Sequence, residues 1–174
     1  MTRRVHQFFH HKCFVLIGPP ASGKSTWRAK NLSTNLITND TPETHAVVIS
    51  GDDLIEAEMA LTGDSYPVVF ARHDFKEQKR ILRNQFTQAV EEGRDIVIDR
   101  TNLTVKGRRS FLASLPRTYE RVAVLFDVPL PTLFERLERR GIETGKVIPV
   151  KVVEDMIASY QPPAPGEFDR IIRQ

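Results

Sequence analysis

The chain has 174 residues, of which 40% are hydrophobic and 27% charged, and its formal net charge is +3 at pH 7. This length suits one domain with a single core, and the one cysteine, Cys13, excludes an internal disulfide. No run reaches the roughly 20 apolar residues of a membrane span, so we expect a soluble cytoplasmic protein without membrane contact. The mildly basic charge favours a polyanionic partner.

The first predicted strand, residues 14–17, is followed at once by Gly-Pro-Pro-Ala-Ser-Gly-Lys-Ser and then by a stretch that can be helical, 26–30. This is the context that a phosphate-binding loop requires. The loop's N–H groups and the helix N-terminus form a cradle for phosphate, Lys24 can reach the β- and γ-phosphates, and Ser25 can bind Mg²⁺. The predicted ATP-binding residues are Gly18, Pro19, Ala21, Ser22, Gly23, Lys24, Ser25 and Thr26.

The rest of the chain alternates apolar β-branched runs with helical patterns. We predict strands at 46–49, 96–98, 122–126 and 168–172, a mobile loop at 31–45, one long helix from 67 to 92, a helix from 130 that ends at Gly141, and a stiff Pro-rich connector at 161–166. This alternation indicates an α/β fold of three layers around a central parallel sheet. We expect a single domain over 1–174, with a flexible basic segment at 1–11.

Two aspartates follow the second predicted strand, at the sheet edge where the phosphate loop also opens. A carboxylate there can accept the proton of a hydroxyl that attacks a γ-phosphate. We assign this role to Asp52 and expect Asp53 to cap a helix that starts at Leu54, close to the acceptor. The alternative is that either aspartate only caps the helix.

The third predicted strand ends at Asp99, which is placed to support Mg²⁺ beside the phosphate loop, although a strand-end turn would also explain it. Thr101 and Asn102 follow at the same edge as candidate acceptor-binding residues. Three basic residues come next, Lys106, Arg108 and Arg109. They either track the phosphates of an acceptor, with Arg109 as the candidate, or form a solvated helix face.

An arginine-rich segment precedes the stretch from Gly141 to Lys146, which we interpret as a Gly-bounded loop that forms a small lid. Guanidinium groups carried by such a lid can stabilise the charge of the transferring phosphoryl group. We predict this catalytic role for Arg136 and Arg140, with Arg140 also binding ATP. The alternative is an exposed Arg/Glu helix surface.

These motifs together resemble the kinase domain of the bacteriophage-type polynucleotide 5′-kinases. The matching segments are 18–27, Asp52-Asp53, 99–103, 126–129, 136–141 and 147–156. The resemblance implies an adenylate-kinase-like P-loop fold and transfer of the ATP γ-phosphate to the 5′-hydroxyl of DNA or RNA, in nucleic acid repair or modification. By position, it implies that Lys24 and Ser25 hold phosphate and Mg²⁺ and that Asp52 is the general base. If the protein is viral, the site of action is the host cytoplasm.

Two positions depart from that family. It normally has an arginine three residues after the general base, which grips the acceptor's phosphate, and often a basic residue before the aspartate pair; here these positions are Ile55 and Gly51. An apolar Ile cannot make a charge-assisted contact. Either Arg72, Arg100 or Arg109 replaces the grip, or the acceptor is another hydroxyl, such as that of a hydroxymethylated base, a nucleoside or a small metabolite. A nucleotide-dependent switch without phosphotransfer is the third hypothesis.

Overall fold

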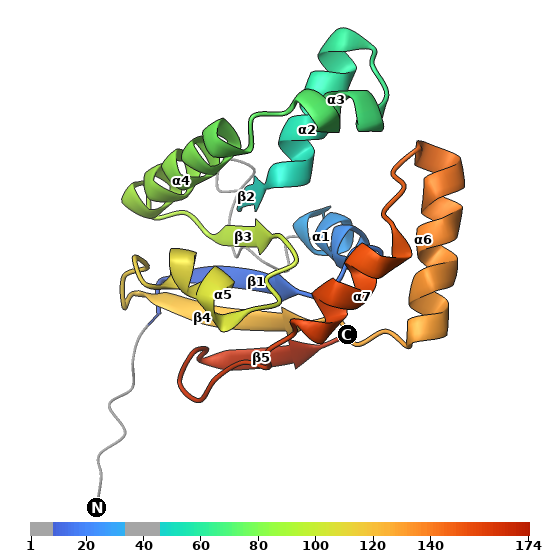
Figure 1. Cartoon of the computed structure of the whole chain (residues 1–174). Coiled ribbons are helices and arrows are strands. Elements are labelled where there is room, and N and C mark those ends of the chain that lie inside the picture. The colour runs from blue at the N-terminus through green and yellow to red at the C-terminus, as the bar shows by residue number, and fades with distance from the viewer. Residues whose placement is uncertain (1–8, 34–45) are drawn as a thin grey trace, which may run out of the picture.

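The computed structural model describes residues 9–33 and 46–174, and these form a five-stranded sheet with helices on both faces (Figure 1). All neighbouring strands are parallel, in the order β2-β3-β1-β4-β5. The strands are β1 His11–Ile17, β2 Val47–Ser50, β3 Ile96–Asp99, β4 Tyr119–Leu125 and β5 Arg170–Arg173. The helices are α1 Lys24–Ser33, α2 Gly51–Thr62, α3 Tyr66–Arg72, α4 Phe75–Glu91, α5 Val105–Leu112, α6 Leu130–Thr144 and α7 Val150–Ala158.

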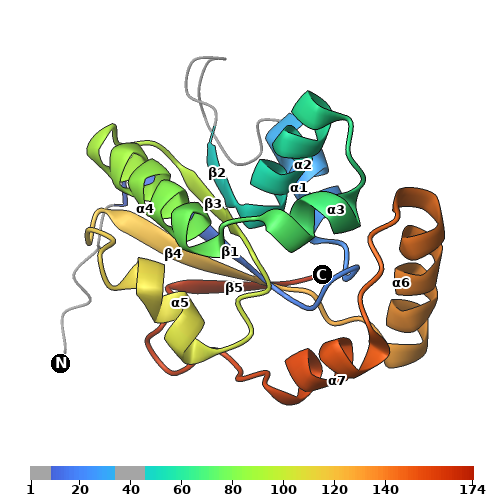
Figure 2. The same ribbon diagram turned by 45° about the horizontal axis from the view of Figure 1, so that its top comes forward.

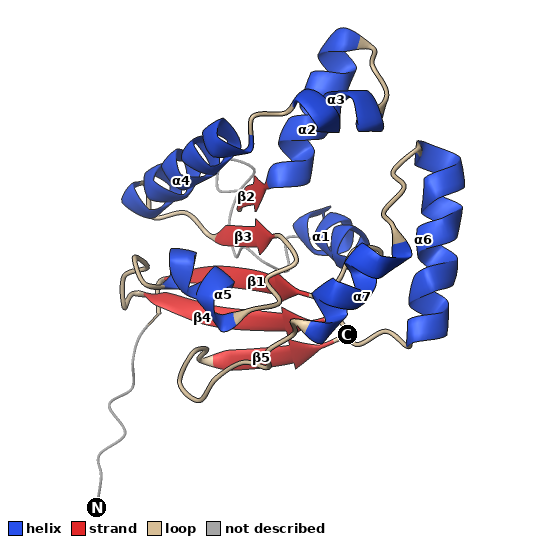
Figure 3. Ribbon diagram, in the orientation of Figure 1, coloured by secondary structure: helices blue, strands red, loops and turns tan. Residues whose placement is uncertain are grey.

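Helices cover both faces of the sheet (Figure 3), and the central strands carry continuous apolar, buried runs at 13–17, 96–98 and 122–125. One face packs against α4 and α5 through residues such as Phe86 and Phe111, whose rings meet edge to face at 5.2 Å. The other face packs against α1, where Trp27 lies 5.8 Å from the ring of Phe14. This gives the three layers that the alternation of patterns predicted.

A third, smaller cluster of apolar side chains joins α6 and α7 to the phosphate loop. Leu133, Leu137 and Val153 form its buried part, and Ala21 of the loop packs against it. Figure 2 shows α6 and α7 standing beside the sheet rather than on it. The arginine-bearing helix is therefore attached to the nucleotide side of the molecule.

Two predicted helix boundaries are wrong. Residues 67–92 form two helices, because the Asp74 carboxylate accepts hydrogen bonds from the N–H groups of Lys76 and Glu77 and so caps a new helix. The helix predicted to end at Gly141 continues to Thr144, and the Gly145 N–H donates to the Gly141 carbonyl at 3.0 Å. A single interior glycine costs a helix only about 1 kcal/mol, which packing can outweigh.

The helix after β2 also begins earlier than predicted. Ser50, not Asp53, is its N-cap, with the side-chain oxygen accepting from the Asp53 N–H at 3.3 Å. The predicted segment 1–11 and loop 31–45 lie largely outside the described residues, but His11 belongs to β1 and residues 31–33 belong to α1. Within 9–33 and 46–174, no helix is both long enough and apolar enough to cross a bilayer.

The Pro-rich stretch 161–166 connects α7 to β5, as predicted, and is fixed by a buried ion pair. The Arg108 guanidinium contacts both carboxylate oxygens of Glu167, at 2.7 and 3.0 Å, and also donates to the carbonyls of Gln161 and Pro162. Arg108 is 1% exposed. It therefore anchors the connector and is not available to track acceptor phosphates.

Candidate active site

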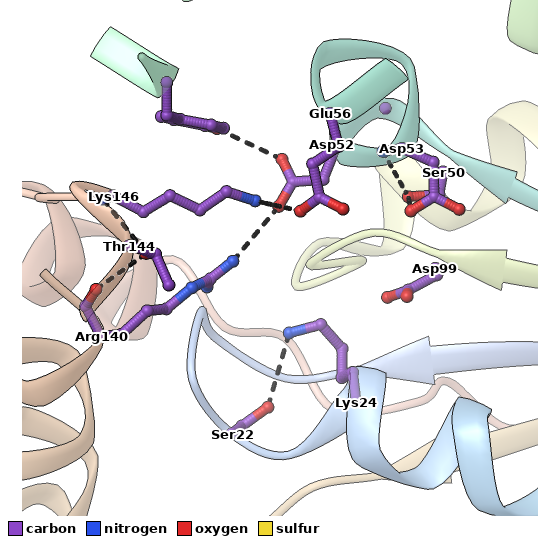
Figure 4. Close-up of polar contacts among 12 residues, drawn as sticks. Ser22, Lys24, Ser50, Asp52, Asp53, Glu56, Asp99, Arg140, Thr144 and Lys146 are labelled. Atoms are coloured by element: carbon purple, nitrogen blue, oxygen red, sulfur yellow. Dashed lines mark hydrogen bonds and ion pairs between the residues drawn. The ribbon is translucent and has the colours of Figure 1, made fainter. Parts of the chain in front are cut away.

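The phosphate loop between β1 and α1 has the backbone geometry that its sequence predicts. Gly23 has φ +103° and Ala21 has φ +61°, both in the left-handed region. The Lys24 side chain curls back over the loop, and its ammonium donates to the carbonyls of Gly18 and Pro19 at 2.8 and 2.6 Å. Figure 4 shows it beneath Asp52 and beside Asp99.

Lys24 is a weakened base in this setting. Burial lowers its pKa to about 8; the carboxylates of Asp99 and Asp52 oppose the shift, and the Arg140 charge adds to it. A bound triphosphate would supply negative charge beside the ammonium. Nucleotide binding therefore favours the charged form of Lys24.

Asp52 lies at the start of α2, on the far side of the cavity from the phosphate loop (Figure 4). Its carboxylate is about half exposed and lies 3.7 Å from both the Arg140 guanidinium and the Lys146 ammonium. The Tyr66 hydroxyl donates to it at 3.4 Å. Both oxygens therefore have partners here, and release of Arg140 would leave a carboxylate oxygen able to accept a proton from a hydroxyl bound in the cavity.

Asp53 and Asp99 share a partner that the sequence analysis did not identify. One guanidinium nitrogen of Arg28, in α1, lies 3.0 Å from both Asp53 oxygens and 3.1 Å from Asp99. The Ser50 hydroxyl also donates to Asp53 at 2.8 Å. Asp53 therefore joins α2 to α1, and no contact in the described chain directs it toward an acceptor.

Asp99 ends β3 beside Leu16 of β1, so it lies at the base of the cavity. Its side chain is only 9% exposed, and burial raises its pKa above the ordinary carboxyl value while Arg28 and Lys24 oppose the shift. A divalent cation would favour the charged form in the same way. Ser25 lines the same cavity, so the two predicted Mg²⁺ residues offer the oxygen donors that this cation prefers.

Arg140 lies on helix α6, which also includes the first residues of the segment predicted as a loop. Arg136 lies one turn earlier, and both arginines line the cavity, as does Arg139. The Thr144 hydroxyl donates to the Arg140 carbonyl at 2.8 Å and closes the last turn of the helix. Arg140 thus reaches Asp52 from a rigid support.

Lys146 is a second lid cation, and the sequence analysis did not single it out. Although it follows a helix, it is 6% exposed, because its ammonium pairs with Glu56 and lies 4.5 Å from the Tyr66 ring centroid. Figure 4 shows Lys146 and Arg140 crossing the cavity side by side to α2. Ion pairs of these two cations therefore hold the lid against α2 at Asp52 and Glu56.

The remaining predicted acceptor residues divide into two groups. Thr101 lines the cavity, and its carbonyl accepts from the Gly18 N–H at 3.0 Å. Asn102 is buried, with φ +49°, and its amide donates to the carbonyls of Leu16 and Ile98 at 2.8 and 3.1 Å. Arg109 is exposed on α5 and is not among the cavity-lining residues. The structure therefore gives Asn102 a structural role and leaves Arg109 outside the cavity.

One cavity of about 1490 Å³ brings these groups together. It exceeds the roughly 300–1,000 Å³ of ordinary small-molecule pockets, so it has room for a nucleotide and a second substrate. Both Lys24 and Asp52 line it, which places a phosphate-binding ammonium and a carboxylate base on one shared space. This arrangement suits transfer of a phosphoryl group to a hydroxyl.

The residues that sequence reasoning missed had weak signals. Arg28 follows Lys24 by one helical turn and so faces the same side of α1, which could have pointed to it. Lys146 lies 90 residues from Glu56, and no local pattern joins them. Only the folded chain brings these two together.

Comparison with solved structures supports the fold. A chain from the Pnkp1/Rnl/Hen1 RNA repair complex matches with a TM-score of 0.67 and 22% identity, over 91% of this chain and 46% of that one. A fungal RNA kinase matches at 0.52 and 17%, over 96% and 75% of the two chains, and a gluconokinase from Sinorhizobium meliloti 1021 at 0.51 and 17%, over 95% and 82%. This chain thus spans less than half the length of the first, and the three show a shared P-loop kinase fold.

The family comparison covers the whole site. Its match extends over residues 14–163, from β1 and the phosphate loop through Asp52 and Asp99 to the lid. That range is most of the chain and includes every charged group of the site described in this subsection. The chain belongs to the AAA domain family AAA_33.

Proposed function

We propose that the chain is an ATP-dependent kinase that transfers the γ-phosphate to a hydroxyl of a nucleic acid, with the 5′-end of DNA or RNA as the principal acceptor. The observation that carries the proposal is the shared cavity of Lys24 and Asp52, with Arg140 reaching Asp52. The motifs that resemble bacteriophage-type polynucleotide 5′-kinases support the acceptor. So do the similar folds of a fungal RNA kinase and an RNA repair complex component.

In the proposed reaction each residue has a separate role. The acceptor hydroxyl gives its proton to an Asp52 oxygen as its own oxygen forms a bond to the γ-phosphorus. The bond from that phosphorus to the β,γ-bridging oxygen breaks, and ADP leaves. Lys24 binds the β- and γ-phosphates, and Arg136 and Arg140 stabilise the charge on the transferring group. Ser25 and Asp99 would hold Mg²⁺, which neutralises phosphate charge when bound.

The resting contacts of Asp52 fit this sequence of events. Arg140 and Lys146 lie equally far from its carboxylate. When a triphosphate enters, its charge attracts Arg140, and Asp52 gains a free face for the acceptor. Arg140 therefore exchanges the Asp52 carboxylate for a phosphate group of the nucleotide.

A second candidate acceptor is a small polyol or sugar acid. The fold shared with a gluconokinase and the Ile at position 55 favour it. Labelled ATP offered with acceptors that carry only one kind of hydroxyl separates the candidates: a 5′-OH oligonucleotide, a 5′-phosphorylated strand with a hydroxymethylated base, a nucleoside, or gluconate. Label on the 5′-end supports the proposal, and label on any other acceptor alone contradicts it.

Asp52→Asn distinguishes a kinase from a nucleotide-dependent switch. A kinase should lose about 10²- to 10⁴-fold in kcat, because the proton acceptor is gone, while ATP affinity measured by calorimetry stays within about twofold. Asp64→Asn is the matched control, since Asp64 pairs with Arg72 outside the cavity lining. Unchanged turnover in Asp52→Asn would exclude Asp52 as the base.

A further inference from the structure

Three aromatic side chains form one continuous wall of the cavity, on the side opposite the phosphate loop. The Tyr66 and Phe70 rings are stacked with centroids 5.7 Å apart, and Phe70 meets Phe75 edge to face at 5.1 Å. All three line the cavity, and they come from α3 and the first residue of α4. We call these residues the aromatic wall.

The aromatic wall is left open to the cavity. Phe70 is 45% exposed and Phe75 is 44% exposed. On α3 the core contact is made by Val69, which is fully buried, so the helix does not need Phe70 for its packing. Large exposed rings that face a cavity are a binding surface by default, since burying them is favourable.

The wall begins at the general base. The Tyr66 hydroxyl contacts the Asp52 carboxylate, and burial together with the Asp52 charge raises the pKa of Tyr66 to about 12, so this hydroxyl stays protonated and donating. An acceptor whose hydroxyl reaches Asp52 therefore lies against Tyr66, and its next few atoms lie against Phe70. The wall is placed to hold the group that carries the reacting hydroxyl.

A cation without an acidic partner lines the same cavity. Arg100 follows β3 at the sheet edge, and its guanidinium carbon lies 6.0 Å from the centroid of the Phe111 ring. Across 9–33 and 46–174, no carboxylate pairs with it. Arg72 instead binds Glu58 and Asp64 and does not line the cavity. Of the three arginines that could replace the missing grip, only Arg100 is available to an anion in the cavity.

Packing leaves no room for a basic side chain at positions 51 and 55, where the similar family often has one. Ile55 is 2% exposed, and a Cβ on Gly51 would lie 3.1 Å from the Gln78 amide group, which itself donates to the Gly51 carbonyl at 2.9 Å. A charged side chain at position 51 would displace that amide. A cation that binds an anion on this side of the cavity therefore has to come from another position, and Arg100 is the candidate that lines the cavity.

We propose that the aromatic wall stacks the terminal base of a single-stranded nucleic acid end, while Arg100 pairs with the first internucleotide phosphate. The inference rests on the proposed kinase function and names its acceptor more closely. Stacking on rings with a cation at the backbone is the general mode of single-strand recognition. A sugar acid has no ring face to stack, and a paired end already has its base covered. An unpaired end is therefore the occupant that uses both features.

The test compares three DNA acceptors and the same three in RNA, with labelled ATP at saturation: a 5′-OH single strand, the same strand with an abasic first residue, and a hairpin with a paired 5′-end. The wild type should show about tenfold or higher kcat/KM for the intact single strand than for the other two, because a stacked base contributes that much. Phe70→Ala should lose this preference by raising KM only for the intact strand. Phe70→Leu keeps the apolar volume and should lose it too.

Val68→Ala is the matched control, because Val68 lies on the same helix, is 49% exposed and does not line the cavity. Arg100→Gln should weaken the intact and abasic strands equally and reduce the salt dependence of KM by one phosphate contact. Equal use of intact and abasic strands by the wild type would overturn the inference, as would a Phe70→Ala defect of the same size on both. If no strand is labelled at all, the proposed function fails instead.

Discussion

Lys24 shows at the residue scale how the site is prepared for its ligand. Without a triphosphate its ammonium is held by two carbonyls of its own loop, in a buried position that weakens it as a base. The same burial strengthens its attraction for phosphate, since few waters compete. We therefore expect Lys24 both to bind the phosphate charge and to change its protonation when that charge arrives.

Binding of an ATP analogue should be accompanied by proton uptake at pH 8. Free Lys24 has a pKa of about 8 and is half protonated there, and phosphate charge moves its pKa back toward the ordinary 10.5. Calorimetry in two buffers of different ionisation enthalpy should report uptake of about half a proton, and affinity should fall as pH rises above 8. In Lys24→Arg, whose guanidinium stays charged, uptake should vanish. Equal uptake in that variant would contradict the assignment.

Arg108 forms a buried ion pair with Glu167 away from the cavity. Burial raises the pKa of Glu167, but hydrogen bonds from Arg108 and from the Ala164 N–H outweigh this and hold it below the usual value. Arg108→Met should destabilise the protein by roughly 3–5 kcal/mol in urea denaturation, because the Glu167 side chain, only 6% exposed, is left without a cationic partner. Lys106→Met, exposed on the same helix, should cost less than about 0.5 kcal/mol.

The effect should depend on pH in a set direction. The Glu167 pKa is depressed in the folded protein, so the pair contributes its full stability above the unfolded value of 4.5 and loses it as pH falls through the folded pKa. The gap between wild type and Arg108→Met should therefore narrow below pH 4.5. A gap that stays constant into acid would show that lost packing, not the ion pair, sets the cost.

At the element scale, α2 and the end of α6 form a clasp across the cavity. The buried Lys146, just after α6, contributes its ammonium group, and Glu56 and Asp52 of α2 contribute their carboxylates. The chain between Thr144 and Val150 is also held by the packing of Ile148 against the α6–α7 cluster, and this clasp adds its contact with α2. Loss of one partner should free the lid without disturbing the sheet.

Glu56→Gln should raise amide hydrogen exchange at residues 145–148 by about threefold to fivefold, since a partly exposed ion pair contributes up to about 1 kcal/mol. Glu58→Gln is the control on the same helix. Glu58 pairs with Arg72 of α3, so its loss should leave exchange at 145–148 unchanged. Equal exchange in all three proteins would show that the packing of Ile148 against the α6–α7 cluster, not charge, holds the lid.

Sequence patterns predicted the sheet and the phosphate loop because both depend on local order: apolar strands, then glycines and Lys24 at fixed spacing. The break at Asp74 was readable in principle, since Asp-Phe-Lys-Glu is a capping sequence. The continuation of α6 through Gly141 was not, because Gly141 and Gly145 both offer a stop and only the structure shows that Gly145, with φ +70°, caps the helix. The roles of Lys146 and Arg28 depend on partners far away in the sequence, which periodicity does not reveal. The rings of the aromatic wall lie within ten residues of one another, and only their place in the cavity needed the folded chain.

At the scale of the whole molecule, the cavity lies between three parts of the structure. The phosphate loop belongs to the sheet, Asp52 and the aromatic wall to α2–α4, and Arg140 to the α6–α7 cluster. A nucleotide bound in the middle contacts the first and the last. Ligand binding should therefore stabilise the entire fold rather than one element.

An unreactive ATP analogue with Mg²⁺, at about 100 times its Kd, should raise the melting temperature by about 5–10 °C, which corresponds to roughly 2.7 kcal/mol for a domain of this size. Chelation of the metal should remove most of the shift, because Ser25 and Asp99 then lose the ion that links them to the phosphates. Lys24→Ala should show little shift at the same concentration. A full shift with chelator present would argue against a metal between these two residues.

Arg136 and Arg140 lie four residues apart on one unbroken helix, so they are separated by about 6 Å along a stiff rod. Because the helix is rigid, the two arginine side chains keep this spacing and approach a ligand together. If both arginines bind phosphate as proposed, a triphosphate can meet both guanidinium groups at once, whereas a diphosphate can meet only one. We therefore expect the diphosphate product to bind this helix more weakly than the triphosphate.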